Sequence, residues 1–335
     1  MKKPLLRILT FALSLLLLLS LSACGNQADE TPEITVPDEY TRYISPWTED
    51  VVAQAKSSGT MEFYFMSDLG STKPAKWGDS CLIVFPNGET MLVDAGSAEH
   101  GNLLIWNLKR MGITRLDYIL ISHDHDDHHF GVSKTALLDE FEVGKLYYNQ
   151  IYHSGWHDTR HLEGPVEERS IPYEPLAAGD VLTFGDVRME VLWPAQETKG
   201  TSVHNNDDLN KLSMVVRFDY GETSALFTGD IYVQTEEHLA DVCGEKLDVD
   251  LLKLPHHGAL TSNSEALANA TTPQISVGSG HQAVSALVYS RYTSVGSKVL
   301  LDFCDGYIHV TSDGTQLQYE TSQERTTNIY ADYEQ

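Results

Sequence analysis

The feature that most limits what this chain can fold into is a run of histidines and aspartates directly after an apolar stretch. Residues 116–121 read as a buried strand, and residues 122–129 follow as Ser-His-Asp-His-Asp-Asp-His-His. A segment after a buried strand lies in a loop at a sheet edge, where catalytic groups collect. Imidazole and carboxylate groups are ligands that Zn²⁺ and similar metals prefer. We therefore predict a metal site; the alternative is a solvated loop or nonspecific metal-trapping tract, which rarely follows a buried strand.

Strand-like and helix-like runs alternate along the rest of the chain. Residues 86–88, Pro-Asn-Gly, lie between two apolar runs and indicate a β-hairpin. The spacing of apolar residues predicts a helix at 103–111, which Gly112 ends. Two groups of strands with helices between and after them favour one domain of two packed sheets with helices on the outer faces. Besides 116–121, the predicted strands are 61–66, 80–85, 90–94, 181–184, 187–192, 213–218, 225–228, 249–254, 274–277, 298–303, 307–311 and 317–319, and the later helices are 233–239 and 264–270.

The N-terminus has the pattern of a secretory signal. Basic residues precede an apolar run at 8–21, which is shorter than the ~20 residues of a membrane span. Residues 21–24, Leu-Ser-Ala-Cys, resemble the bacterial lipobox, in which the cysteine is lipidated and becomes the mature N-terminus; an ordinary cleaved signal is the alternative. We expect a protein anchored by lipid on the extracellular face of the cell membrane. The predicted segments are a signal at 1–23, lipidated Cys24 with a polar tether at 24–58, the folded domain at 59–322 and a polar tail at 323–335.

Charge and cysteine content limit the partners. Loss of residues 1–23 removes three positive and no negative charges, which changes the net charge from −25 to −28. Such a chain repels phosphate backbones at long range, so nucleic acid would not bind through a broad basic surface. A local cationic pocket made by metal ions stays compatible with this charge. Cys81, Cys243 and Cys304 allow one disulfide at most, and we expect a monomer.

Three motifs together resemble one known family. The run His123-x-His125-x-Asp127-His128 is similar to the signature of the metallo-β-lactamase superfamily. Residues 93–96, Val-Asp-Ala-Gly, resemble its first motif, whose aspartate supports the metal loop. Residues 226–230, Leu-Phe-Thr-Gly-Asp, resemble the strand end that carries its bridging aspartate. The resemblance covers residues 61–319 and implies the superfamily's α/β fold, a four-layer αββα sandwich.

The resemblance also implies a hydrolase with two divalent metal ions, which activate water for attack on phosphorus or a carbonyl carbon. Zn²⁺ is expected first, with Mn²⁺ or Fe as alternatives. His123 and His125 would bind one metal, Asp127 and His128 the other, and Asp230 both. Asp127 is also expected among the catalytic residues.

Further segments resemble one branch of the superfamily, the soluble domain of ComEC-type DNA-uptake proteins. These segments are residues 86–88, 178–180, 192–194 and 252–258. The same branch is similar to phosphorylcholine esterases of Gram-positive surfaces, which are extracellular. An extracellular location agrees with the expected lipid anchor.

One ligand of the superfamily pattern is missing from this sequence. Many members carry a histidine just ahead of the strand predicted here at 213–218, where this chain has Asn210 and Ser213. These two residues match an Asn-x-x-Ser pattern of the ComEC-type branch and are candidate pocket residues. His204 lies too far ahead of the strand to be the preferred ligand. We expect one metal to lack a protein ligand and to hold more water.

The last ligand comes from a pair of histidines. Pro255-His256-His257-Gly258 follows a buried strand, so at least one imidazole should face the site. We favour His256 as the metal ligand and His257 as a catalytic donor to the oxyanion or the leaving group. The reverse assignment and a purely structural turn are the alternatives. His281 follows another strand end, where it lines the pocket or packs in the core.

A phosphodiester is the first substrate hypothesis: a phosphorylcholine or teichoic-acid-type ester, or extracellular nucleic acid. Residues 147–161 are rich in aromatic and imidazole groups, and Tyr152 and Trp156 could surround a quaternary ammonium group. Packing of this loop on the core is the alternative. A lactamase or lactonase acting on C–N or C–O bonds is a second hypothesis, and a non-catalytic, metal-dependent surface binding protein is a third. We find no Gly-x-Ser-x-Gly elbow, P-loop or dinucleotide fingerprint.

Overall fold

The computed structural model describes residues 45–48, 50–66, 78–99, 101–154, 161–280 and 284–325. All of them belong to the unit that spans residues 36–335. The expected signal, Cys24, Trp156 and His281 lie outside the described residues. Within the described ranges, no helix has both the length and the apolar composition that crossing a membrane requires.

The first β-sheet has eight strands in the order β17-β16-β1-β2-β3-β4-β5-β7. Every residue of β1, β2 and β3 is buried, as expected of strands covered on both faces. β2 and β3 form the predicted hairpin, in which Gly88 adopts a φ of +88° that favours glycine. The bounds are β1 (Met61–Phe65), β2 (Ser80–Val84), β3 (Thr90–Ala95), β4 (Arg115–Ile121), β5 (Glu142–Tyr148), β7 (Tyr173–Pro175), β16 (Ile308–Ser312) and β17 (Leu317–Thr321).

The second sheet has seven strands in the order β15-β14-β13-β12-β11-β9-β8. β8, β9, β11 and β12 pair antiparallel, whereas β12 to β15 run parallel to one another. A separate pair joins β6 (Tyr152–His153) to β10 (Ser202–Val203). The bounds in the second sheet are β8 (Val181–Phe184), β9 (Val187–Trp193), β11 (Val215–Tyr220), β12 (Thr223–Phe227), β13 (Leu251–Lys253), β14 (Ile275–Gly278) and β15 (Lys298–Leu301).

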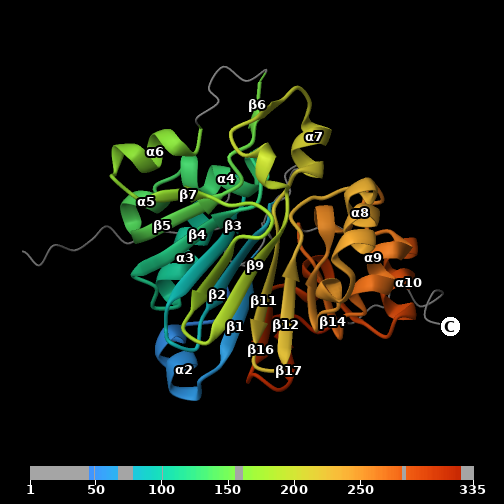
Figure 1. Cartoon of the computed structure of the whole chain (residues 1–335). Coiled ribbons are helices and arrows are strands. Elements are labelled where there is room, and N and C mark those ends of the chain that lie inside the picture. The colour runs from blue at the N-terminus through green and yellow to red at the C-terminus, as the bar shows by residue number, and fades with distance from the viewer. Residues whose placement is uncertain are drawn as a thin grey trace, which may run out of the picture. The chain divides into compact units, whose positions relative to one another are not determined.

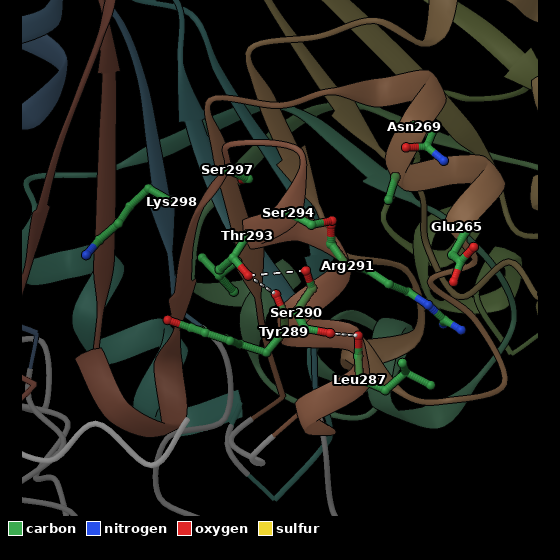
Figure 2. A pocket seen from close by; sticks show the side chains of 12 residues that line it. Glu265, Asn269, Leu287, Tyr289, Ser290, Arg291, Thr293, Ser294, Ser297 and Lys298 are labelled. Carbon is green, nitrogen blue, oxygen red and sulfur yellow. Dashed lines mark hydrogen bonds between the residues drawn. The ribbon is translucent and has the colours of Figure 1, made fainter. Parts of the chain in front are cut away.

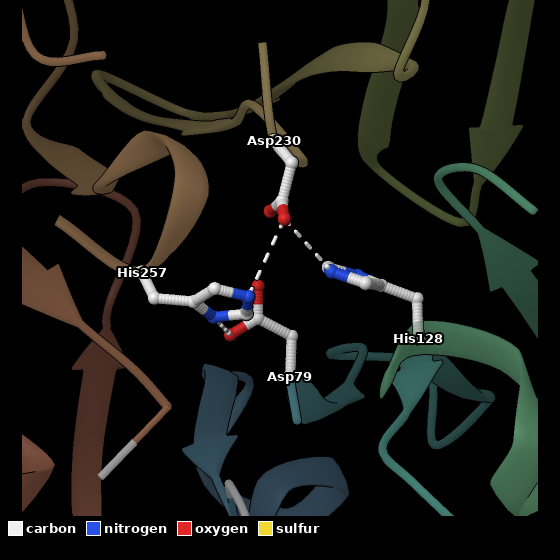
Figure 3. A group of neighbouring side chains, drawn as sticks. All are labelled: Asp79, His128, Asp230 and His257. Carbon is white, nitrogen blue, oxygen red and sulfur yellow. Dashed lines mark hydrogen bonds and ion pairs between the residues drawn. The ribbon is translucent and has the colours of Figure 1, made fainter. Parts of the chain in front are cut away.

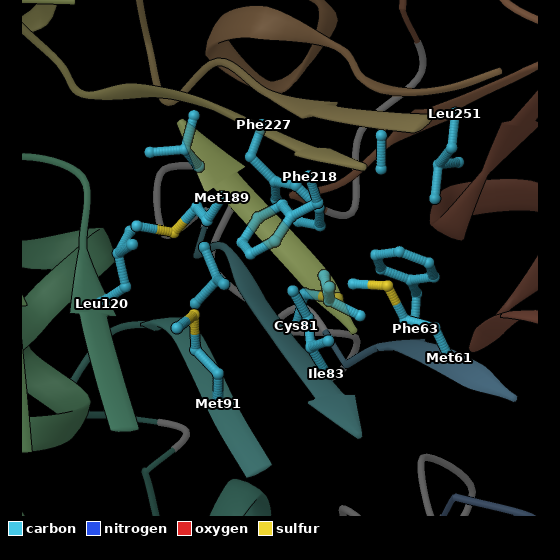
Figure 4. Packing of buried hydrophobic residues seen from close by; sticks show 14 of the residues in the cluster. Met61, Phe63, Cys81, Ile83, Met91, Leu120, Met189, Phe218, Phe227 and Leu251 are labelled. Carbon is cyan, nitrogen blue, oxygen red and sulfur yellow. The ribbon is translucent and has the colours of Figure 1, made fainter. Parts of the chain in front are cut away.

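The two sheets pack face to face around an apolar core (Figure 4). Phe63 and Ile83 of the first sheet lie in the same cluster as Phe218 and Phe227 of the second, and none is more than 4% exposed. The rings of Phe63 and Phe227 stack with their centroids 6.1 Å apart. Full burial of side chains of this size stabilises a fold by about 1.5–3 kcal/mol each.

Helices cover the outer faces of both sheets (Figure 1). A second apolar cluster joins Leu239 of α8, Ala268 of α9 and Tyr292 of α10 to Leu252 and Val299 of the second sheet. Helices α3, α4 and α5 lie on the first sheet, so the layers confirm the predicted αββα sandwich. The helix bounds are α2 (Val51–Ser58), α3 (Gly101–Arg110), α4 (Asp126–Ser133), α5 (Leu137–Glu140), α6 (Glu163–Glu168), α7 (Asn206–Lys211), α8 (Val233–Cys243), α9 (Glu265–Thr271), α10 (Ala286–Ser294) and α11 (Asp302–Asp305), with 3-10 helices η2 (Gln196–Thr198), η3 (Gly244–Leu247) and η4 (Pro255–Gly258).

The folded part extends beyond the predicted limits of residues 59 and 322. Helix α2 lies in the expected tether, where Asp50 caps it by accepting a hydrogen bond from the backbone N–H of Ala53 at 2.9 Å. Only two of its residues are buried, which leaves too little apolar periodicity for the sequence to reveal the helix. At the other end, Arg325 donates to Asp305 and to the carbonyl of Val299. The three described cysteines, Cys81, Cys243 and Cys304, are free.

The segments that follow β4, β12 and β13 lie side by side. The backbone N–H of Met214 donates to the carbonyl of Ser122 at 2.8 Å, which joins the segment after β4 to the second sheet. The N–H of His256, after β13, donates to the carbonyl of Gly229, after β12, at 3.1 Å. Side chains from both sheets can therefore meet at this end of the sandwich.

Candidate metal centre

Four buried side chains converge where these segments meet: Asp79, His128, Asp230 and His257 (Figure 3). Each offers one potential ligand atom, and these atoms all lie within 4.8 Å of one another. The four residues come from the start of β2, from α4 and from the segments after β12 and β13. Among the residues that the structure describes, no other group of three or more such side chains satisfies this condition.

Asp94 at the end of β3 holds the metal loop in place, as the sequence predicted for this aspartate. Its Oδ1 accepts a hydrogen bond from the backbone N–H of Ser122, and its Oδ2 accepts one from the Ser122 hydroxyl, both at 2.8 Å. The same Oδ2 lies 2.8 Å from Nδ1 of His128. The turn between β4 and α4 and the first imidazole are thus fixed by one buried carboxylate.

The contacts of His128 fit a bound cation. Because Nδ1 donates to Asp94, Nε2 of the neutral ring is an acceptor. This Nε2 lies 3.2 Å from Oδ2 of Asp230, which is also an acceptor. Neither Nε2 of His128 nor Oδ1 of Asp230 has a hydrogen-bond partner, although both atoms are buried. A metal ion coordinated by both residues would satisfy these atoms.

His257 has the same two-sided arrangement. Its Nδ1 lies 3.3 Å from Oδ1 of Asp79. Its Nε2 lies 3.3 Å from Oδ2 of Asp127 and 3.3 Å from Oδ2 of Asp230. A carboxylate on one ring nitrogen and the metal on the other is the usual environment of a metal-binding histidine.

His123 lies beside His128, and His125 lies beside His123. The ring centroids of His123 and His128 are 4.2 Å apart, and Nε2 of His123 lies 2.9 Å from Nδ1 of His125. Burial and the neighbouring imidazoles of His128 and His125 hold the pKa of His123 well below its ordinary value. A neutral imidazole is the form that binds metals, so His123 is prepared for this role.

The carboxylates give the centre a strongly negative character. Burial alone raises the pKa of Asp230, but the imidazoles of His257 and His128 outweigh it and hold the pKa well below its ordinary value. Burial alone lowers the pKa of His128, but the carboxylates of Asp230, Asp94 and Asp127 raise it well above its ordinary value. Positive charge is therefore stabilised here, whether protons or metal ions carry it.

The histidine pair is arranged in the opposite way to the assignment that we favoured. His257 is fully buried and faces Asp127 and Asp230, as a metal ligand should. The His256 side chain is 16% exposed; its Nε2 lies 3.8 Å from Asp230, and its Nδ1 bonds to the Thr261 hydroxyl at 2.6 Å. The geometry thus favours His257 as the ligand and His256 as the residue at the edge of the site.

Asn210 contacts His256 at the edge of the centre, and a pocket role for Asn210 and Ser213 stays a prediction. Asn210 donates from Nδ2 to the hydroxyl of Tyr232 at 3.0 Å, and its Nδ2 is 3.5 Å from Nε2 of His256. Oδ1 of Asn210 and Oγ of Ser213 are buried without a hydrogen-bond partner. His204 bonds instead to Ser154 at 2.6 Å and is not part of the converging group.

Tyr152, proposed as part of an aromatic box, has its hydroxyl committed to Glu163, which also accepts a hydrogen bond from Tyr148. This contact agrees with the alternative in which the tyrosines of the loop pack on the domain. Trp156, the other candidate, lies outside the described residues.

Two buried residues of the centre were not identified from the sequence. Asp79 precedes β2, and Lys253 ends β13; the two form an ion pair. The predicted hairpin contains a signal for Asp79, because the start of β2 must lie next to the end of β3, where Asp94 is found. For Lys253 the signal is a charged residue inside an apolar strand, just ahead of the histidine pair.

A larger hollow lies elsewhere, between α9, α10 and β15, with a volume of about 720 Å³ (Figure 2). Arg291, Lys298 and Glu265 are its charged lining residues. It contains no converging group of potential metal ligands among the described residues. The chemistry therefore places the candidate site at the centre of Figure 3, despite the larger volume of this hollow.

Comparison with known proteins gives relatives by sequence and a solved structure of similar fold. ComE operon protein 3 of Bacillus subtilis is 29% identical over 198 residues, 59% of this chain and 23% of that protein. Exodeoxyribonuclease YycJ of Bacillus anthracis is 29% identical over 144 residues, 42% of this chain and 50% of that protein. The crystal structure of the metallo-beta-lactamase fold protein YhfI from Bacillus subtilis matches with a TM-score of 0.46 and 14% identity, over 72% of this chain and 95% of that one. The chain thus spans about a quarter of the length of its ComE relative, and the predicted ComEC-type resemblance is confirmed.

The family model of the metallo-beta-lactamase superfamily matches residues 77–277, more than half of the chain. This range contains each of the four converging side chains. It also contains Asp94 and the paired histidines at 123 and 125. The match, the αββα layers and the imidazole–carboxylate centre agree with one another, and the chain belongs to the metallo-β-lactamase superfamily.

Proposed function

We propose that this chain is an extracellular, lipid-anchored phosphodiesterase that works with two divalent metal ions. As a member of its superfamily, the chain is a metal-dependent hydrolase; the phosphodiester substrate and the two ions are the proposal. The observation that carries it is the convergence on Asp230 of His128 and His257, at 3.2 and 3.3 Å. Imidazoles and carboxylates suit Zn²⁺ first, and Mn²⁺ or Fe as alternatives.

The side chains would divide between two metal positions. His123 and His125 would hold the first ion, and Asp127, His128 and His257 would hold the second. The Asp230 carboxylate would contribute to both positions. The first position would have fewer protein ligands, because Asn210, and not a histidine, stands ahead of β11. Water would complete this position.

Bound divalent ions supply hydroxide at neutral pH and stabilise the charge on the attacking and leaving oxygens. The residues of the chain would orient the metal ligands and the substrate. Asp94 fixes His128 through Nδ1. His256, partly exposed at the edge of the centre, is placed to donate to a substrate oxygen.

The relatives support a phosphodiester substrate, and the net charge of the chain limits which phosphodiester it would be. The relative YycJ is named an exodeoxyribonuclease, and ComE operon protein 3 belongs to the type of protein that the motifs resemble. The net charge of −25 disfavours a long duplex held along a broad basic surface. A short single strand, or a cell-surface ester of the phosphorylcholine or teichoic-acid type, therefore fits better than duplex DNA.

The location is part of the same proposal. Lipidation of Cys24 would anchor the chain as a monomer on the extracellular face of the membrane, where such substrates occur. Labelling of the chain with a radioactive or clickable fatty acid in the producing cells tests this step, and Cys24→Ala should abolish the label. Label that persists in Cys24→Ala would contradict the anchor.

The activity is tested with the purified chain, metal content measured by elemental analysis, and a panel of four substrates. The panel is a chromogenic phosphodiester, a short single-stranded DNA, a phosphorylcholine ester and a chromogenic β-lactam. We expect turnover of at least one phosphodiester, loss of it with a chelator, and recovery with Zn²⁺ or Mn²⁺. Asp230→Asn should abolish turnover.

Asp305→Asn is the matched control, since Asp305 is an equally buried carboxylate that pairs with Arg325 instead of the metal centre. It should keep turnover. Turnover of the β-lactam alone would replace the proposal with a lactamase. Ligand binding without turnover of any substrate, unchanged in Asp230→Asn, would indicate a binding protein.

A further inference from the structure

Beneath the metal centre lies a buried ion pair that the proposed chemistry does not use directly. Lys253 of β13 and Asp79, just ahead of β2, are each 4% exposed, and they form an ion pair between the two sheets. Removing two charges from water is costly, and their mutual attraction repays this only with good geometry and further hydrogen bonds. A pair kept in this position needs an explanation beyond stability.

The contacts of the pair point toward the metal ligands. Oδ1 of Asp79 lies 3.3 Å from Nδ1 of His257 and also accepts a hydrogen bond from the Ser279 hydroxyl. Nζ of Lys253 donates to the carbonyl of Gly229 at 3.2 Å, the residue just ahead of the bridging Asp230. Its distance to Oδ1 of Asp230 is 3.7 Å. The pair thus contacts both segments that bring second-sheet ligands to the centre.

The position of Asp79 differs from that of a ligand. Its carboxylate faces Nδ1 of His257, whereas Asp230 faces Nε2 on the other side of the ring (Figure 3). Asp127 also faces Nε2. Lys253, Ser279 and the His257 ring already engage the oxygens of Asp79. Asp79 is thus placed behind the ligand.

Asp94 makes the equivalent contact with the other imidazole, because its Oδ2 lies 2.8 Å from Nδ1 of His128. Asp79, Asp94 and Lys253 line one small cavity of about 20 Å³ between the sheets. Two carboxylates from the first sheet, with the ammonium group of Lys253 from the second sheet beside them, therefore each contact one imidazole on its Nδ1 side.

We propose that Asp79 is a positioning residue that keeps the proton of His257 on Nδ1 and directs its Nε2 lone pair to the metal, while Lys253 holds the Asp79 carboxylate in this orientation. The inference rests on the metal centre of the proposed function and is independent of its substrate. A hydrogen-bonded carboxylate fixes the tautomer and the ring orientation of a metal-binding histidine, and its loss typically weakens metal binding by about 10–100-fold.

The test uses the full chain loaded with Zn²⁺ and the variants Asp79→Asn, Lys253→Met and Ser279→Ala. Zinc affinity is measured by competition with a chelating dye, and long-range ¹H–¹⁵N NMR spectra report which ring nitrogen of His257 carries the proton. We expect Asp79→Asn to weaken zinc binding by about 10–100-fold and to shift the His257 nitrogen signals. Lys253→Met should change both readouts in the same direction, and Ser279→Ala should do so to a smaller extent.

Asp305→Asn again serves as control and should leave both readouts unchanged, because a purely structural loss of a buried carboxylate would not reach His257. If Asp79→Asn does not fold, Ser279→Ala decides, since it removes a single hydrogen bond to Asp79. Unchanged zinc affinity and unchanged His257 signals in the folded variants would overturn the proposal. Loss of one full zinc equivalent in Asp79→Asn, with the remaining zinc bound normally, would make Asp79 a direct ligand and overturn it too. Neither readout involves a substrate, so failure of the phosphodiesterase assignment would leave this result intact.

Discussion

His256 and His257 adjoin in the chain, yet they occupy different environments. Both have left-handed backbone conformations, with φ of 49° and 53°. The turn buries one imidazole between Asp79, Asp127 and Asp230, and it places the other against Tyr232, with ring centroids 5.1 Å apart. The division of roles between two identical side chains therefore follows from the backbone.

This division predicts unequal effects of two alanine variants. His257→Ala should lose about one zinc equivalent per chain and nearly all turnover, because it removes a ligand that contacts two carboxylates. His256→Ala should keep the metal and lose turnover only in part, about 10–100-fold if it donates to the transition state. Elemental analysis and steady-state kinetics measure both. Zinc loss in His256→Ala with full zinc in His257→Ala would restore the original preference.

The sequence predicts part of this centre because its residue types and spacing carry the information. The run at 123–128 and Asp230 each follow a strand, Asp94 lies at the end of one, and the structure brings all of them together. The choice between His256 and His257 depends on backbone angles that histidine rarely adopts, so no pattern reveals it. Asp79 is recognised as part of the centre only through its contact with His257, which lies 178 positions away in the sequence. A local motif does not contain such a contact.

At the scale of secondary structure, α4 carries Asp127 and His128 and packs closely against the end of β3. The N–H of Gly131 in this helix donates to the carbonyl of Gly96 at 2.9 Å. A Cβ added at Gly131 would lie 1.9 Å from the carbonyl oxygen of Ala95. Glycine at this position is what lets the helix approach the strand.

Gly131→Ala should therefore displace α4, with a destabilisation of about 1–3 kcal/mol as for overpacked cores, and it should weaken zinc binding. Gly164→Ala is the matched control, because Gly164 also lies in a helix but no atom outside its neighbours comes within 4 Å of an added Cβ. That change should be neutral or stabilising by up to about 1 kcal/mol. Chemical denaturation and zinc titration of both variants test this difference. Equal stability of the two variants would contradict the close packing of α4.

Glu62 makes a second contact between secondary-structure elements, because it joins β1 to β16. Its carboxylate accepts a hydrogen bond from the Thr311 hydroxyl at 2.6 Å, and it lies 2.7 Å from Nε2 of His309. Burial alone raises the pKa of Glu62, but the hydrogen bonds from His309, Thr311 and Thr60 outweigh it, so the pKa lies below 4.5. A carboxyl with a lowered pKa stabilises the fold above its ordinary pKa, and this contribution is lost as the pH falls through the lowered value.

Glu62→Gln should therefore cost about 1–3 kcal/mol of stability at neutral pH, the range for a hydrogen bond to a charged group. The difference from the unchanged chain should shrink as the pH falls below 4.5, because the native carboxyl then becomes protonated as well. Denaturant unfolding of both proteins across this pH range measures it. A difference that stays constant with pH would show that the charge of Glu62 does not contribute.

The elements themselves were predicted unevenly. The strands of the core, such as β1 to β4, are predicted because each is rich in apolar and aromatic residues. Helix α4 was predicted as a loop, because its first turn is made of the metal-binding run and it has little apolar periodicity. β5 and α10 were missed for a related reason: each has charged or polar residues between its buried positions. Local pattern thus succeeds where apolar residues dominate a strand or recur at helical spacing, and it fails where polar residues interrupt both patterns.

At the scale of the whole molecule, the metal centre lies across the boundary between the two sheets. His128 comes from the first sheet's segment, and Asp230 and His257 come from the second's. The centre also brings Asp79, Asp94 and Asp127 together with a single lysine, in a chain whose net charge is −25. Bound cations would therefore both link the sheets and offset concentrated negative charge.

Metal should accordingly stabilise the entire fold and not only the loops that touch it. A ligand that binds only the native state adds about 4 kcal/mol at a free concentration 1,000-fold above its Kd. For a chain of this size we expect Tm to rise by several degrees on addition of Zn²⁺ and to fall again with a chelator. Calorimetry at increasing Zn²⁺ measures the shift, and Asp230→Asn should remove most of it, because this carboxylate faces imidazoles from both sheets. A Tm that is independent of Zn²⁺ while zinc remains bound would mean that the metal binds the unfolded chain as well, and that the sheets are held together by their apolar core alone.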